Sequence, residues 1–316
     1  MDAKHLSKVR RRLERFAGEV LEPVARRDSR AWGVEYLRGV MLDGRRKSIQ
    51  PMAERLGVDH QGLSQFVSQS TWSYYEVRAL LAHRVVAGLG PDVMIVDDSG
   101  FPKQGRMSPG VTHQCCGALG KQANCQVGVS VTLANEKLGC PVNWRLFMPE
   151  SWNDDDDRRA KCHVPEDVTH RPKWQLALDA IDELTEWGVP TGKLPVLGDA
   201  GYGEITAFRL GLEDRGLSYI VEVKSSTSAH RAGAVPALAP GGKRGPKPTT
   251  PKYPPAVSLQ ALAAELPDAA WQHVVWRDGS KGQLGSRFAS IPVRPANKDI
   301  PRDPDTGELP LQLLVL

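Results

Sequence analysis

The feature that most constrains the fold is a change of sequence pattern at residues 88–91, Gly-Leu-Gly-Pro. Before this break, apolar residues recur at the three- and four-residue spacing of one helix face, beginning with Leu6, Val9, Leu13, Phe16, Val20 and Val24. After it, short apolar runs alternate with helical segments. A chain of 316 residues is long enough for two or three domains. The break therefore predicts an all-helical N-terminal domain over residues 1–88, followed by an α/β domain.

Residues 48–67 predict two short helices joined by a tight turn. Ser48 suits the start of the first helix, and Gly57 suits the left-handed residue that ends it. Asp59 suits the N-cap of the second helix, whose apolar residues are Leu63, Phe66 and Val67. Such a pair is typical of a helix-turn-helix, whose second helix enters a major groove, although an ordinary helical hairpin fits the same pattern.

Residues 89–224 predict a mixed sheet with helices packed on it. The expected strands lie at 93–96, 126–134, 142–147, 194–197 and 217–223, and the expected helices lie at 174–187 and 204–215. Three sequential strands followed by alternating helices and strands give the order of a ribonuclease-H-like core. The predicted fold class is therefore α/β.

Two segments follow this core. Residues 225–256 are rich in Ser, Ala, Gly and Pro and predict a flexible basic loop, in which 242–248 faintly resembles a minor-groove arm carrying Lys243 and Arg244. Residues 257–316 predict a β-rich insertion that contains a hairpin with its turn at Asp278-Gly279 and a final strand at 311–316.

Charge is distributed unevenly along the chain, whose net charge is only +4. Residues 1–50 hold thirteen Lys and Arg against seven Asp and Glu, with Arg10, Arg11 and Arg12 adjacent, and residues 224–256 hold six basic residues and no acid. Such local excess suits a polyanion such as DNA, and equally a solvated basic surface. Five cysteines without a C-x-x-C pair favour neither a disulfide framework nor a structural zinc site.

The sequence also predicts a location. No apolar run approaches the ~20 residues of a membrane-spanning helix. The N-terminus turns at once into a charged amphipathic pattern, which is not that of a secretory signal. We therefore expect no membrane association and a cytoplasmic protein.

Two acidic sites are candidates for chemistry because each follows a predicted strand. Asp97 and Asp98 come after 93–96, and Asp199 comes after 194–197. Ligands in open α/β sheets bind beyond the carboxyl ends of strands, and carboxylates gathered there repel one another unless a cation lies between them. Oxygen ligands suit Mg²⁺ or Mn²⁺, and two such ions can clamp a phosphoryl transfer. Either site alone also fits a helix cap or an Asx-turn.

Two further patterns bear on this interpretation. Small residues around Asp199, namely Gly198, Ala200, Gly201 and Gly203, are expected to let a nucleic-acid backbone approach. The four acids at 154–157 cannot converge on one site and predict a solvated loop.

Three blocks resemble the signature blocks of DDE transposases of bacterial insertion sequences, of the insertion sequence 701 type within the insertion sequence 4-like set. They are residues 96–105, 198–203 and 221–224. The resemblance covers nearly the whole chain and implies a ribonuclease-H-like fold, a catalytic Asp-Asp-Glu triad and two divalent metals. It implies double-stranded DNA, both transposon ends and target, as the partner, a homodimer in the synaptic complex, and a location at the bacterial nucleoid.

The resemblance also implies residue roles. The first catalytic and metal-binding Asp maps to Asp98, with Asp97 as its alternative, and the second maps to Asp199. Lys103 and Lys224 become candidate contacts to DNA phosphates, beside the arginines at 10–12 and the basic pair at 243–244.

One departure shapes the functional hypothesis. The glutamate of the family lies on a later helix in a block with Tyr, Arg and Lys, whereas Glu265 and Glu308 stand in other settings. The chain stops within an expected strand, so we expect a truncated form without the third carboxylate. The leading hypothesis is a transposase that cuts insertion-sequence ends and joins them to target DNA by two-metal phosphoryl transfer. The alternatives are a catalytically incomplete DNA-binding remnant acting as a repressor, and a Mg²⁺-dependent phosphatase.

Overall fold

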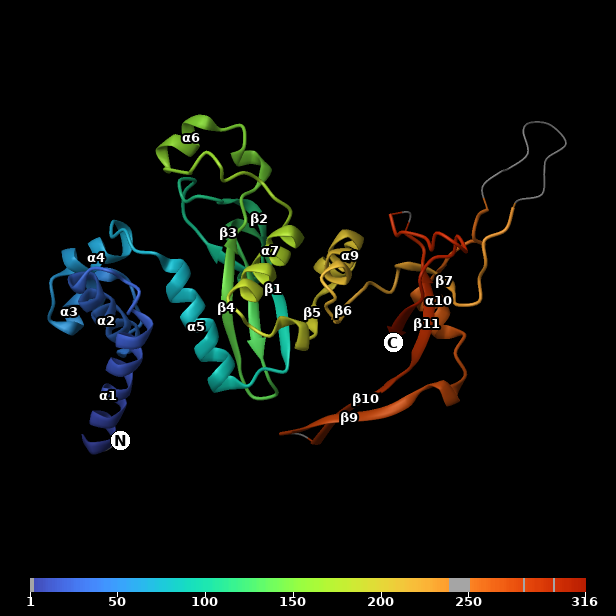
Figure 1. Ribbon diagram of the computed structural model, residues 1–316, viewed down its shortest axis with the longest axis horizontal. Coiled ribbons are helices and arrows are strands. Elements are labelled where there is room, and N and C mark those ends of the chain that lie inside the picture. The colour runs from blue at the N-terminus through green and yellow to red at the C-terminus, as the bar shows by residue number, and fades with distance from the viewer. Residues whose placement is uncertain (1–2, 239–250, 281, 298) are drawn as a thin grey trace. The chain divides into compact units, whose positions relative to one another are not determined.

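The structure is a computed structural model that describes residues 3–238, 251–280, 282–297 and 299–316 (Figure 1). Two compact units divide the chain: residues 1–171 with 179–194, and residues 172–178 with 195–316. Within the described ranges there are ten α-helices and twelve strands, paired both antiparallel and parallel. The chain is therefore a mixed α/β protein, as predicted. No helix in these ranges is long and apolar enough to cross a membrane.

Five helices occupy the first part of the first unit. They are α1 (Ala3–Val20), α2 (Arg27–Met41), α3 (Ile49–Leu56), α4 (His60–Ser68) and α5 (Tyr74–Leu89). Helix α1 meets α2 and α5 through a buried cluster that includes Ala17, Val20, Leu21 and Val77. Helices α2, α3 and α4 pack on one another and form a compact group (Figure 1).

The turn between α3 and α4 has the geometry that the sequence predicts. Gly57 ends α3 in the left-handed region with φ 70°, and its N–H donates to the carbonyls of Ala53 and Glu54. Asp59 caps α4, because its Oδ1 accepts from the backbone N–H of Gln61 at 3.1 Å. Ser48 lies at the N-cap of α3 without a side-chain cap hydrogen bond.

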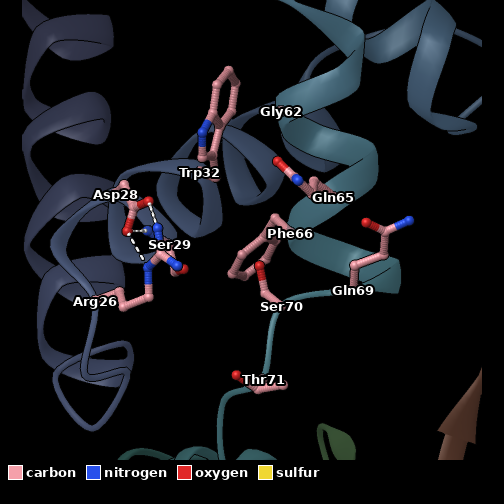
Figure 2. A pocket seen from close by; sticks show the side chains of 10 residues that line it. All are labelled: Arg26, Asp28, Ser29, Trp32, Gly62, Gln65, Phe66, Gln69, Ser70 and Thr71. Carbon is pink, nitrogen blue, oxygen red and sulfur yellow. Dashed lines mark hydrogen bonds and ion pairs between the residues drawn. The ribbon is translucent and has the colours of Figure 1, made fainter.

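Helix α4 approaches α2 closely at Gly62. A Cβ at this position would lie 2.1 Å from the indole ring of Trp32, so only glycine permits this separation. On the same side of α4, Phe66 stacks on Trp72 with ring centroids 5.5 Å apart. The two helices border a pocket of about 220 Å³ lined by Trp32, Gln65 and Gln69 among others (Figure 2).

The sheet of the first unit is built around a long strand, β3 (Lys121–Ala134). It pairs antiparallel with β1 (Val93–Pro102), β2 (Thr112–Cys116) and β4 (Gly139–Leu146). The prediction that the first strand ends at residue 96 is wrong, because β3 pairs with all ten residues of β1. Asp97 and Asp98 consequently lie within the strand and not beyond its end. Strand β2 was not predicted, since its sequence lacks an apolar alternation.

The acidic run is also placed differently from the prediction. The short 3₁₀ helices η1 (Gly117–Leu119) and η2 (Glu150–Trp152) precede helix α6 (Asp156–Lys161). Asp155 caps α6 by accepting from the N–H of Arg158 at 3.1 Å, and the next two acids occupy its first turn. Carboxylates are favourable there because the first turn of a helix has unpaired N–H groups. The run therefore starts a helix and is not a loop, although Asp154, Asp156 and Asp157 are exposed to solvent as predicted.

Helix α5 lies beside the sheet (Figure 1). A largely buried polar cluster holds it there. Glu183 of helix α7 (Lys173–Glu186) has a side chain only 16% exposed, and its Oε2 accepts from Arg78 of α5 and, at 3.0 Å, from Arg145 of β4. The fully buried Asn143 donates to Glu183 at 2.9 Å and to the carbonyl of Ala180 at 2.8 Å. The cluster thus joins α5, β4 and α7 through charged and amide groups that are largely removed from solvent.

The second unit begins with a parallel pair, β5 (Val196–Gly198) and β6 (Tyr219–Val221). Helices α8 (Ala200–Gly203) and α9 (Thr206–Asp214) connect the two strands, whereas the 3₁₀ helix η3 (Thr191–Lys193) precedes them. A four-stranded sheet follows, in the order β12 (Gln312–Val315), β11 (Ser290–Pro295), β7 (Ser228–Arg231) and β8 (Val257–Ser258). Helix α10 (Leu259–Ala264) packs on this sheet through a buried cluster with Ala229 and Val293.

The predicted hairpin is present as a separate two-stranded ribbon, but the predicted turn position is wrong, because Asp278 and Gly279 lie in β9 and pair with Gln283 and Gly282. After the 3₁₀ helix η4 (Asp268–Ala270), β9 (Gln272–Gly279) pairs antiparallel with β10 (Gly282–Phe288), and the ribbon forms a long arm (Figure 1). In the segment predicted as a flexible basic loop, residues 228–231 form strand β7. Lys243 and Arg244 lie outside the described residues.

We predict that Gly62→Ala lowers the free energy of unfolding by about 2 kcal/mol, because its methyl group would overlap the Trp32 ring and force the helices apart. Gly18→Ala is the matched control, since no atom lies within 4 Å of the added Cβ. In that exposed helical position alanine should stabilise by about 0.5–1 kcal/mol. Urea unfolding followed by circular dichroism measures both, and equal effects of the two substitutions would contradict the close-approach argument.

A second comparison tests the polar cluster. Arg78→Ala should lower the free energy of unfolding by about 3 kcal/mol, because it leaves the buried carboxylate of Glu183 with one cation fewer. Arg84 forms an ion pair with Glu19, but the two side chains are 50% and 42% exposed. Arg84→Ala should therefore cost under about 1 kcal/mol. Similar urea midpoints for the two variants would show that the cluster contributes little.

Candidate active site and nucleic-acid interface

Asp98 lies on the apolar face of strand β1. Side chains alternate along a strand, so Asp98 shares a face with Met94 and Val96, both of which are buried. Its partner across the sheet is Val129, which is 0% exposed. Asp98 itself is half-buried. A carboxylate therefore ends an otherwise apolar stripe, which is a costly position unless the charge has a partner.

Asp97 points to the opposite face and is exposed. Its Oδ1 accepts from the backbone N–H of Asp98 at 2.7 Å, and its carbonyl accepts from the Ser130 hydroxyl at 3.2 Å. The two adjacent carboxylates thus have different surroundings, and Asp98 is the one that belongs to the buried face.

Asp199 is the N-cap of α8. Its Oδ1 accepts from the backbone N–H groups of Gly201 at 3.0 Å and Tyr202 at 3.3 Å. The capping role that the sequence offered as an alternative is therefore present. Both bonds use Oδ1 of an exposed side chain, so capping does not engage Oδ2.

Gly203 has a structural reason that differs from the one expected. A Cβ at this position would lie 1.9 Å from the carbonyl oxygen of Glu222, just after β6. Glycine here lets the end of α8 press against this backbone, while Tyr202 packs against Phe208 with ring centroids 5.4 Å apart. Gly203 therefore has a packing role, while the expectation that the glycine-rich block makes room for nucleic acid stays a prediction.

Sequence reasoning missed Glu204, which directly follows the glycine-rich block. Its carboxylate accepts from the backbone N–H of Lys224 at 3.3 Å, from the Lys224 ammonium and from the Thr227 hydroxyl at 3.1 Å. The hydrogen bond from the Lys224 ammonium is the largest cause of a lowered pKa of Glu204. Lys224, a candidate phosphate contact, is therefore ion-paired with a neighbouring carboxylate.

Other candidate DNA contacts lie on the surface. Arg10, Arg11 and Arg12 are exposed on α1. Lys103 is exposed just after β1, and its backbone is held by Asn124 through two hydrogen bonds of 2.9 Å. These positions leave each cation accessible to a polyanion.

The two later glutamates considered for the triad are both ion-paired. Glu265, at the end of α10, accepts from Arg231 at 2.8 Å, and this hydrogen bond lowers its pKa. Glu308 accepts from Arg294 at 2.6 Å. Both glutamates therefore form ion pairs within the second unit.

The ligands for a divalent cation can be judged from these positions. Asp98 belongs to the first unit and Asp199 to the second. Both carry hard oxygen donors of the kind Mg²⁺ and Mn²⁺ prefer. In the part of the chain that the structure describes, no group of three or more His, Cys, Asp or Glu side chains is placed to hold a metal. The donor chemistry fits a divalent cation, and the number of grouped ligands falls short of a three-carboxylate site.

Comparisons with known proteins identify relatives. The sequence model of the family described as DDE superfamily endonuclease matches residues 19–283. A probable transposase for insertion sequence element IS701 from Microchaete diplosiphon is 28% identical over 192 residues. This alignment covers 60% of the chain and 47% of the relative, so the chain spans about half the length of the curated relative it matches.

We predict that Asp199→Ala lowers the free energy of unfolding by about 1 kcal/mol through loss of the cap. Asp199→Asn retains an acceptor oxygen and should lie within about 0.3 kcal/mol of the wild type. Urea unfolding of the three proteins measures this difference. If both variants are equally unstable, the negative charge matters to folding and the cap alone does not account for Asp199.

Proposed function

The chain belongs to the DDE superfamily of endonucleases, and from this membership we propose that it acts in transposition as a DNA transposase. In this role it binds the ends of an insertion sequence, cuts them and joins them to target DNA. The observation that carries the proposal is that the family match runs through both aspartate blocks, at residues 97–98 and 199. The similarity to a probable transposase agrees with it.

Asp98 and Asp199 are the proposed catalytic and metal-binding carboxylates. Asp98 is favoured over Asp97 because it lies on the face of β1 that carries the buried Met94 and Val96, whereas Asp97 lies on the exposed face. Asp199 keeps Oδ2 outside its capping bonds, so it can cap α8 and present an oxygen at once. A bound Mg²⁺ or Mn²⁺ would supply charge stabilisation for attack on a phosphodiester.

The proposal extends to fold and partners. The antiparallel strands β1 and β3, and the parallel pair β5–β6 connected by helices, support a ribonuclease-H-like core. The exposed arginines at 10–12 support contacts to double-stranded DNA. A homodimer bringing two DNA ends together, located at the nucleoid, completes this proposal.

A second function, DNA binding without cleavage, is supported by two observations. Asp199 has a structural role as a cap, and the left-handed Gly57 and the Asp59 cap between α3 and α4 are compatible with a DNA-binding helix-turn-helix. A protein of this kind would occupy insertion-sequence ends and repress its parent element.

The test is a strand-cleavage assay of the full chain on duplex DNA carrying both flanks of its gene, in Mg²⁺, Mn²⁺ or EDTA. We expect metal-dependent nicks at the element ends. Asp98→Asn and Asp199→Asn should lower the cleavage rate at least ~100-fold, because each removes one metal-binding charge. Asp157→Asn, an exposed acid of α6, is the matched control and should cleave normally.

Three outcomes discriminate the proposals. Cleavage that survives Asp199→Asn would leave Asp199 as a cap only and would overturn its catalytic role. Salt-sensitive DNA binding without nicks in any metal would support the second function. Absence of both binding and cleavage would contradict both functions.

A further inference from the structure

Helix α4 carries a polar stripe on its exposed side. Gln61, Ser64, Gln65 and Ser68 are all exposed, and their spacing of three, one and three residues places them on one helix face. None of them is charged. Leu63, 0% exposed, and Phe66, 5% exposed, lie on the opposite face. The helix therefore presents a row of amides and hydroxyls, of which the Ser68 hydroxyl donates to the Ser64 carbonyl at 2.8 Å and keeps its oxygen as an acceptor, while the other face is fixed in the core.

The position of α4 is rigidly defined. Asp59 fixes its first turn, the left-handed Gly57 fixes the angle to α3, and Gly62 brings it against Trp32. Gln65 borders the pocket of about 220 Å³ between α2 and α4 (Figure 2). The backbone of Gln65 is therefore fixed by the helix, while its exposed side chain has room to turn toward a ligand.

The chemistry of the stripe matches base edges. Glutamine can donate to and accept from adenine in the major groove, and serine can contact either kind of edge. Val67 beside the stripe is 53% exposed, and an apolar side chain can contact a thymine methyl group. In the described part of the chain, the side-chain amides of Gln61 and Gln65 form no hydrogen bond with another protein group.

Two arginines of the same helical group suit a nucleic acid as the partner, whereas Asp59 at the start of α4 and Asp28 in the pocket beside Gln65 are the acids near the stripe. Between Asp59 and Glu76 the sequence has no acidic residue. Arg45 and Arg46 are exposed in the loop that precedes α3. The guanidinium of Arg55 donates to the carbonyl of Arg46 at 2.7 Å and so ties this loop to α3. Arg45 and Arg46 are therefore two exposed cations on a loop that a hydrogen bond holds to α3, and such cations suit contacts to DNA phosphates.

We propose that α4 lies in the major groove of duplex DNA and that Gln61, Ser64, Gln65 and Ser68 read base edges there, while Arg45 and Arg46 contact phosphates. This inference rests on the proposed function, because it names the part of the chain that recognises the insertion-sequence ends. It separates sequence reading, by neutral side chains of α4, from sequence-independent attraction by arginines.

The experiment selects duplexes bound by the full chain from a library with twenty randomised base pairs, and sequences the bound fraction. The wild type should enrich one sequence pattern. Gln65→Ala, and separately Gln61→Ala, should remove the preference at one or two adjacent base pairs and weaken binding to the enriched duplex about 10-fold or more. Gln50→Ala, the same change on an exposed residue of α3, is the matched control and should keep the pattern.

A second variant separates the two kinds of contact. Arg45→Ala should weaken binding to all duplexes and reduce the slope of log affinity against log salt by about one, with the enriched pattern unchanged. Because Gln61 and Gln65 are exposed, their variants should keep the urea midpoint of the wild type, which verifies folding.

The outcomes distinguish this inference from the proposed function. If both glutamine variants enrich the wild-type pattern, α4 does not read bases and the inference is overturned, even when the wild type still cleaves. Duplex binding without any enriched pattern overturns it as well. If the wild type retains no duplex, the inference and the proposed function fail together. Loss of the pattern in the variants of a protein that cuts no DNA supports the inference and contradicts the transposase proposal.

Discussion

The packing of the first unit depends on the ion pairs and hydrogen bonds that the Glu183 carboxylate forms. A carboxylate removed from water must be compensated by cations and donors, and here these come from Arg78 on one helix and from Arg145 and Asn143 on a strand. The requirement for all three partners fixes α5 against β4 and α7. Helix α5 also contacts α1. It therefore connects the N-terminal helices to the sheet. Glycine-mediated close packing then sets the positions of α2 and α4 on that base.

Predictions from sequence succeeded where the signal was local. Gly57 and Asp59 were identifiable because a left-handed helix end and an N-cap depend on one residue and its immediate neighbours. The length of β1 was not identifiable, since residues 97–102 are extended only because β3, far along the chain, supplies their hydrogen bonds. Strand β2 shares that dependence on β3. The acidic run failed for another reason: four charges suggest solvent, whereas one of them, Asp155, caps a helix.

The candidate site was predictable to a similar degree. The sequence indicated the aspartates by their place after apolar runs, but it could not rank Asp97 against Asp98. Strand alternation shows that their surroundings differ, because it assigns Asp98 to the face of Met94 and Val96, while the choice of Asp98 as the catalytic residue stays a prediction. For Asp199 the sequence allowed a cap or a ligand, and the two-oxygen carboxylate is compatible with both. The Glu204–Lys224 pair was missed because its members are twenty residues apart in the sequence. They meet only because β6 packs against α8 in the fold.

Helix α4 has a consequence for how such a protein can diverge. Its inner face is intolerant of change, since Gly62 has no space for even one methyl group and Leu63 is wholly enclosed. Its outer stripe is exposed, and exposed substitutions usually alter stability by no more than about 0.5 kcal/mol. Substitutions on the outer face can therefore accumulate, because they do not cause the protein to misfold. The outer face of α4 can thus change by single amino-acid substitutions while the packing that holds the helix remains constant.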